Sequence, residues 1–130
     1  MVDNSMKSED VVAAIIKKDN LYFIAQRSRD KHMGLKWEFP GGKVEANETL
    51  QVALIREIHE ELNININVYE KIAEEKYKDS KINIVLHYFL CSIKDGDISL
   101  NEHEAMEWVD KTDFDKYDFV VGDGNITSLI

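Results

Sequence analysis

The chain has 130 residues, of which 44% are hydrophobic and 32% charged, a length and composition that indicate one globular domain with a real core. Its formal net charge of −9 argues against tight binding to a nucleic-acid polymer, which needs a basic surface. No apolar run approaches the ~20 residues of a membrane span, and no signal-peptide pattern opens the chain. We therefore expect neither a nucleic-acid polymer nor a membrane as a partner.

The lone cysteine, Cys91, cannot form an internal disulfide and lies in the apolar run 84–93. A buried, inert thiol is the simplest interpretation. A cytoplasmic location follows from it as a default prediction.

Residues 1–10 are polar and predict a flexible N-terminal tail, which leaves 11–130 as a single domain. Val11–Lys17 and Leu21–Gln26 are rich in apolar and β-branched residues, which predicts two strands. Asp19-Asn20 lies between them and favours a hairpin.

Residues 28–36 predict a charged loop, and Pro40 beside two glycines predicts a turn within 37–42. A helix is predicted from about Thr49, a suitable N-cap, to Leu62. Asn63 then stands where helices often end in a left-handed residue.

Further strands are predicted at 64–69, 73–78, 82–93 and 105–109. A short helical turn is predicted at 112–117, and a glycine-broken loop then leads from Gly122 into a terminal helix. These elements together predict an α+β domain with a mixed central sheet and helices packed on it.

The predicted helix carries its charge on one side. At about 100° per residue, Glu57, Glu60 and Glu61 fall within roughly one quadrant, away from an apolar stripe. Like charges one turn apart destabilise a helix, so the cluster suggests a bound cation. A solvated acidic face is the alternative interpretation.

This stretch matches the pattern G-x5-E-x7-R-E-U-x-E-E-x-G-U, in which U is a bulky aliphatic residue. The matching residues are Gly42, Glu48, Arg56, Glu57, Ile58, Glu60, Glu61 and Ile64. Asn63 replaces the last glycine, and Asn also tolerates the left-handed conformation. The pattern resembles the Nudix box, which implies the Nudix fold, an α/β/α sandwich.

The resemblance extends beyond the box to the MutT branch, through Val11–Ile16, 25–27 and 34–45. Glu102 lies six residues before Trp108, similar to the spacing of a loop glutamate in that branch. Asp123 occupies a place where relatives carry a base-reading Asn or Asp.

The resemblance implies a Mg²⁺ cofactor, with Mn²⁺ as an alternative, because hard cations prefer oxygen ligands. The implied ligands are Glu57, Glu60, Glu61, Glu102 and a backbone carbonyl of Gly41 or Gly42. Glu104 and Glu107 are rivals to Glu102 in the same acidic loop.

The implied reaction is the hydrolysis of a nucleoside triphosphate to the monophosphate and pyrophosphate by a metal-activated water. Glu60 or Glu57 would act as the general base, with Glu102 as an alternative. Arg56 orients a glutamate in the family pattern, and Glu48 has a similar supporting role.

Five residues are candidates for substrate binding. Arg27 and Lys43 suit phosphate, although a surface role is the alternative for each. Phe39 could stack on the base or pack in the core, and His32 could contact the base or have no function. Asp123 could accept hydrogen bonds from a donor-rich base edge or cap a helix.

The resemblance therefore predicts a nucleotide-sanitising pyrophosphohydrolase, with oxidised dGTP as the leading substrate. CTP or modified dCTP is the alternative substrate. A non-catalytic nucleotide-binding regulator is the alternative from another class. A monomer and a homodimer both remain open.

Overall fold

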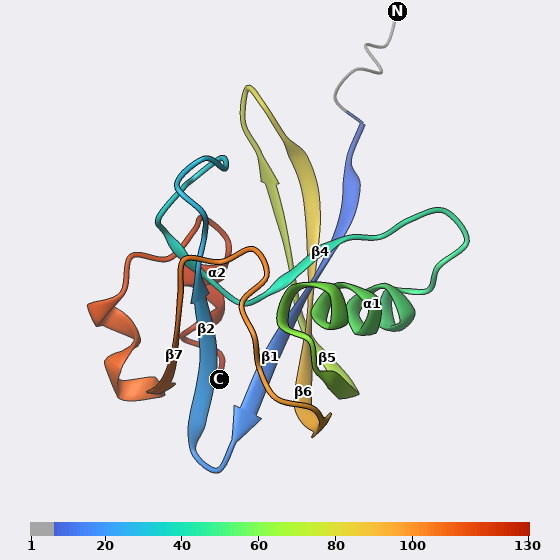
Figure 1. Ribbon diagram of the computed structural model, residues 1–130. Coiled ribbons are helices and arrows are strands. Elements are labelled where there is room, and N and C mark those ends of the chain that lie inside the picture. The colour runs from blue at the N-terminus through green and yellow to red at the C-terminus, as the bar shows by residue number, and fades with distance from the viewer. Residues whose placement is uncertain (1–6) are drawn as a thin grey trace, which may run out of the picture.

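The computed structural model describes residues 7–130, which form a β-sheet with helices on both of its faces (Figure 1). In chain order the elements are β1 (Glu9–Lys18), β2 (Leu21–Gln26), β3 (Trp37–Glu38), β4 (Gly41–Lys43), α1 (Leu50–Leu62), β5 (Asn65–Lys78), β6 (Asn83–Asp95), β7 (Ala105–Asp110), the 3-10 helix η1 (Lys111–Lys116) and α2 (Asp123–Ile126). None of the helices in the described residues is long and apolar enough to cross a membrane.

The sheet has seven strands in the order β3-β2-β1-β6-β5, with β4 beside β1 and β7 beside β2. β1 runs parallel to β6, with Glu9 opposite Ile84 and Ile16 opposite Cys91. It runs antiparallel to β2 and to β4. The predicted mixed sheet is therefore confirmed.

Alternate residues of β1 belong to two different cores, as the period of a strand requires. Val12 and Ala14 are fully buried on the side of α1. Ala13 and Ile15 pack on the opposite face, in the core that contains Phe114 of η1 and Ile126 of α2. Both faces are thus covered, and the predicted α/β/α sandwich is confirmed.

The ends of α1 form as predicted. The Thr49 hydroxyl accepts a hydrogen bond from the Val52 N–H at 3.1 Å, so Thr49 is the N-cap. Asn63 ends the helix with a φ of 60° and donates its N–H to the His59 carbonyl. Asn63 therefore performs the helix-ending role that the family pattern gives to glycine.

The segment 37–42 is more regular than the predicted turn. It forms two short strands on the edge of β1 opposite β6, because β3 pairs with β2 and β4 pairs with β1. Pro40 contributes its carbonyl, which accepts from the Ala14 N–H at 2.8 Å. A side chain on Gly41 would collide with the backbone of Val12, so this close approach requires glycine.

Three elements differ most from the predictions. β1 begins at Glu9, so the last residues of the predicted tail pair with β6, while 1–6 lie outside the described residues. The strands predicted at 64–69 and 73–78 are one strand, β5, in which register shifts near Lys71 absorb the irregular pattern. The terminal helix is the single turn of α2, after which the hydroxyls of Thr127 and Ser128 bond to nearby carbonyls.

Candidate active site

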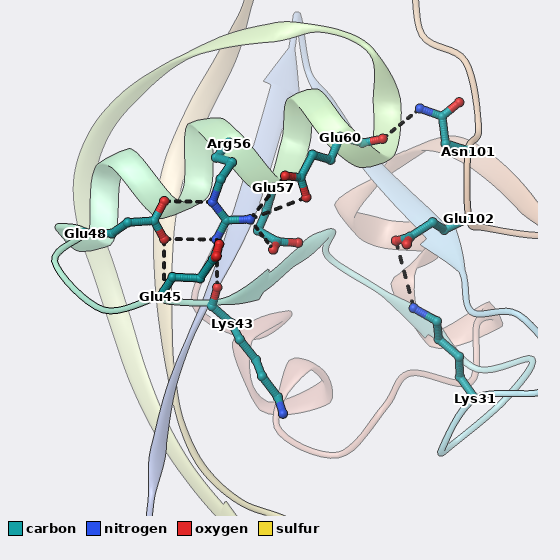
Figure 2. A network of polar contacts seen from close by, with 9 residues as sticks. All are labelled: Lys31, Lys43, Glu45, Glu48, Arg56, Glu57, Glu60, Asn101 and Glu102. Carbon is teal, nitrogen blue, oxygen red and sulfur yellow. Dashed lines mark hydrogen bonds and ion pairs between the residues drawn. The ribbon is translucent and has the colours of Figure 1, made fainter.

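Arg56 connects Glu48, which lies just before α1, to the acidic face of α1 (Figure 2). Its guanidinium donates to both oxygens of Glu48, at 2.7 and 2.9 Å, and to Glu57 at 2.8 Å. A further hydrogen bond reaches the Lys43 carbonyl at 3.1 Å. The contact with Arg56 lowers the pKa of Glu48 to about 2, so Glu48 remains ionised at neutral pH. Because Arg56 occupies both oxygens of Glu48, the pair suits the predicted supporting role of these two residues.

Glu61 is the most buried carboxyl group of the acidic face, with 4% of its surface exposed. Burial raises its pKa well above the ordinary value, and a hydrogen bond with Glu57 and the charges of Glu38 and Glu102 raise it further. A buried carboxylate next to other carboxylates is costly unless a cation compensates it. Without a cation Glu61 therefore tends to keep its proton, whereas a bound cation would favour its ionised form.

Gly42 brings the backbone of β4 directly against this cluster. A side chain at Gly42 would collide with the carboxylate of Glu57. Gly41 and Gly42 both line the same cavity as Glu57, Glu60 and Glu61. The strand thus lies close enough for a backbone carbonyl to join the carboxylates.

The loop after β6 carries Glu102 to the same cavity, and Asn101 attaches this loop to the end of α1 (Figure 2). The Asn101 side chain donates to the Glu60 carbonyl at 2.7 Å, and its N–H donates to the Glu61 carbonyl at 3.0 Å. These bonds satisfy carbonyls that a helix end leaves free. The rivals of Glu102 lie elsewhere: Glu104 contacts Arg29, and Glu107 is on β7 opposite Ile24.

A divalent cation fits this set of oxygen donors. Within residues 7–130, no three acidic, histidine or cysteine side chains are already gathered in a ligand geometry. Mg²⁺ does not need a complete protein cage, because it usually retains waters and shares substrate phosphates. The buried Glu61 and the neighbouring carboxylates would hold part of the coordination shell, and waters and phosphates would complete it.

Glu38 is a cavity residue that the sequence patterns did not single out. Its two oxygens accept from Arg27 and His103, each at 2.8 Å. The side chain of His103 is almost fully buried, and its Nε2 lies 3.9 Å from Glu61. The signal was present in the sequence, since Glu38 lies beside the glycine turn, but only the fold brings Arg27 and His103 to it.

Asp123 lies at the part of the cavity that α2 contributes, and it is 3% exposed. Its oxygens accept from the Phe39 N–H at 2.9 Å and from the Tyr88 hydroxyl. Burial raises the pKa of Asp123 to about 7. The N-cap of α2 is Gly122, so the helix-capping alternative for Asp123 is wrong.

Phe39 and His32 border the cavity, but both have partners within the protein. The ring of Phe39 is buried and stacks on Phe119 at a centroid distance of 5.6 Å. The core-packing alternative therefore describes this ring. His32 places its Nε2 3.1 Å from Asp79, which connects the loop 28–36 to the turn between β5 and β6.

The two predicted phosphate contacts differ in their surroundings. Arg27 lines the cavity but is held by Glu38 and by the His32 carbonyl, at 2.8 and 2.9 Å. Lys43 is mostly exposed and forms an ion pair with Glu9 at 3.3 Å. Its side chain extends away from the carboxylates of α1 (Figure 2).

One cavity of about 430 Å³ unites these groups. Its lining includes Glu57, Glu60 and Glu61 from α1, Glu102 from the following loop, and Asp123 from α2. Such a volume is in the range of small-molecule sites.

Known proteins share this pattern. A sequence model of the NUDIX domain matches residues 7–130. The CTP pyrophosphohydrolase of Escherichia coli K12 is 40% identical over 103 residues, which cover 79% of this chain and 76% of that protein. The 8-oxo-dGTP diphosphatase of the same strain is 32% identical over 115 residues, which cover 88% and 89%.

Solved structures agree with the sequence relatives. The solution structure of the E. coli ORF135 protein has a TM-score of 0.83 at 34% identity and covers 99% of this chain and 92% of its own. A MutT NUDIX hydrolase from Burkholderia pseudomallei has a TM-score of 0.87 at 22% identity, with coverage of 95% and 98%, and shows the same fold. The chain therefore belongs to the Nudix family of hydrolases.

Proposed function

We propose that this Nudix hydrolase is a divalent-metal-dependent nucleoside triphosphate pyrophosphohydrolase, which releases a nucleoside monophosphate and pyrophosphate. One observation carries the proposal: the carboxylate cluster of α1, which includes the buried Glu61, and the buried Asp123 of α2 line one cavity of nucleotide-compatible size. The first group suits metal-bound phosphates, and the second suits a base.

Glu57, Glu61 and Glu102 would hold Mg²⁺ or Mn²⁺, together with Glu60 and a carbonyl of Gly41 or Gly42. When bound, the cation neutralises phosphate charge and lowers the pKa of water. Arg56 holds Glu57 with a short hydrogen bond of 2.8 Å. The Glu60 side chain is 57% exposed, and its contact with Arg56 is longer, at 3.4 Å. We therefore favour Glu60 as the proton acceptor, with Glu57 as the alternative.

The substrate proposal depends on Asp123. An ionised carboxylate accepts hydrogen bonds only, so it suits a base edge that presents N–H groups. Oxidised dGTP is the leading candidate, because the segments around Arg27 and Glu38 resemble the MutT branch and a relative is an 8-oxo-dGTP diphosphatase. CTP or modified dCTP is the second candidate, favoured by the 40% identical CTP pyrophosphohydrolase.

The test is pyrophosphate release from a panel of normal and modified nucleoside triphosphates, with and without Mg²⁺. We expect turnover that requires the cation and one nucleotide with a clearly larger kcat/KM. Equal slow turnover of all nucleotides would overturn both substrate assignments. No turnover, with binding retained, would instead favour a nucleotide-binding regulator.

The proposal includes a cytoplasmic enzyme that acts on small molecules as a monomer or a homodimer. Cys91 is buried, and burial raises the pKa of its thiol to about 12, as expected of an inert thiol. Fractionation of cells measures the location, and light scattering on the purified protein measures the oligomeric state.

A further inference from the structure

Lys31 lies in the loop between β2 and β3 and belongs to no part of the sequence pattern. The loop is closed by backbone hydrogen bonds from Arg27 to Lys36 and from Lys31 to Ser28. It carries the Lys31 ammonium group to within 3.9 Å of Glu102, and both residues line the cavity (Figure 2). A cation thus stands next to a predicted metal ligand.

The other cationic side chains of the cavity are more firmly held. Arg27 contacts Glu38 at 2.8 Å, and Lys43 contacts Glu9 at 3.3 Å. Among the lysines and arginines of residues 7–130 that line this cavity, Lys31 has the longest contact with its carboxylate. At 3.9 Å this contact is an ion pair without a hydrogen bond, and about half of each side chain is exposed.

We propose that Lys31 has two successive partners: Glu102 before the metal binds, and the β- and γ-phosphates of the nucleotide afterwards. This inference rests on the proposed function. A divalent cation at Glu102 competes directly with the ammonium group for the same carboxylate. Lysine has a flexible stem and three N–H donors, so a displaced Lys31 can turn to another anion that enters the cavity.

The negative charge of the cavity explains why a mobile cation such as Lys31 would help to bind phosphates. Carboxylates line it at Glu38, Glu57, Glu60, Glu61 and Glu102. These groups repel every phosphate oxygen that the cation does not cover. Arg27 is already bonded to Glu38, and the Lys43 side chain extends away from the α1 carboxylates (Figure 2). Among the lysines and arginines of the described cavity lining, Lys31 can therefore compensate the outer phosphates without breaking a short hydrogen bond.

The inference predicts opposite effects of Lys31→Ala on two ligands. Mn²⁺ alone, measured by electron paramagnetic resonance, should bind up to about 5-fold more tightly, because a weak competing ion pair is lost. Pyrophosphate in the presence of Mg²⁺, measured by calorimetry, should bind at least about 10-fold more weakly, because a charged hydrogen bond is lost. Lys31→Arg should restore most of the pyrophosphate affinity.

Arg29→Ala is the matched control, since Arg29 is in the same loop and its loss changes the net charge equally. Arg29 contacts Glu104 and does not line the cavity, so both affinities should stay close to those of the wild type. A double-mutant cycle adds Glu102→Gln, in which Lys31→Ala should no longer tighten Mn²⁺.

Two results would overturn the inference about Lys31. One is an unchanged pyrophosphate affinity in Lys31→Ala, and the other is a parallel loss of Mn²⁺ and pyrophosphate affinity, which a merely structural role produces. Either result, with normal Mg²⁺-dependent turnover of the wild-type protein, leaves the proposed function intact. A wild-type protein without that turnover would instead contradict the proposed function.

Discussion

The charged groups on the α1 side of the cavity come mainly from one continuous segment, 57–61, whereas those on the α2 side come from segments far apart in the chain. Helix geometry alone places Glu57, Glu60 and Glu61 together. Asp123, in contrast, meets Phe39 across 84 residues and Tyr88 across 35. The proposed metal ligands of α1 are therefore encoded locally, whereas the residue proposed to contact the base is placed by long-range contacts.

The largest effect is expected on the α1 side, for Glu61→Gln. Replacement of groups that merely support a metal ligand typically costs 10–100-fold in activity, so loss of a buried ligand should cost more than about 100-fold in kcat. The metal-free variant should unfold at the same or a higher urea concentration, because a buried acid beside other carboxylates is removed. Turnover assays and urea titrations measure the two effects.

The matched comparison for this variant is Glu60→Gln, at a half-exposed position on the same helix. If Glu60 is the proton acceptor, kcat should fall while Mn²⁺ affinity falls less than in Glu61→Gln. Wild-type turnover and Mg²⁺ dependence in Glu61→Gln would contradict the metal-site proposal.

Arg56→Lys should have the next largest effect, a loss of about 10–100-fold in kcat. Lysine retains the charge but cannot bond to both oxygens of Glu48 and to Glu57 in the same geometry. Turnover at saturating Mg²⁺ measures the loss. A value within twofold of the wild type would show that Arg56 does not orient Glu57.

The sequence allows the α1 side to be predicted because its information is short-range. Thr49, Asn63 and the apolar stripe define the helix, and the spacing of the glutamates defines the face. It did not reveal Glu38 or Lys31 as site residues, because their importance depends on His103, Arg27 and Glu102, which the fold brings near. Phe39 shows the same limit: its ring could be assigned to the core only once Phe119 was placed beside it.

On the α2 side, Asp123→Asn should change the ratio of kcat/KM between the preferred nucleotide and the other nucleotides by about 10-fold. The kcat on the nucleotide that the wild type prefers least should change little. When ionised, the carboxylate accepts hydrogen bonds only, whereas an amide also donates, so above pH 7 kcat/KM should fall most for nucleotides whose base edge presents N–H donors. The nucleotide panel measures the ratio. An unchanged ranking would remove Asp123 from base recognition.

The same variant tests the electrostatics of Asp123 through stability. The pKa of Asp123 is raised to about 7 by burial, whereas an unfolded Asp has a pKa of about 4. Between these values the folded state retains a proton that the unfolded state has lost, so the free energy of unfolding decreases as pH rises through this window. Urea titrations of the metal-free proteins at pH values from about 4 to 7 should show a smaller decrease for Asp123→Asn. An equal decrease in both proteins would contradict the raised pKa.

The smallest effect is expected for Asn101→Ala, which tests whether the loop carrying Glu102 belongs to the local or the long-range part of the site. The variant removes the 2.7 Å bond to the Glu60 carbonyl and retains the backbone bond to Glu61. One such hydrogen bond contributes about 1 kcal/mol, so Mn²⁺ affinity should fall by about 5-fold.

Asn67→Ala is the matched control, because Asn67 bonds to Ser92 on β6 and does not line the cavity. An equal change of Mn²⁺ affinity in both variants would show that the contact between Asn101 and α1 does not position Glu102. A loss confined to Asn101→Ala would show that the end of α1 positions the fourth carboxylate as well as the three that the helix carries.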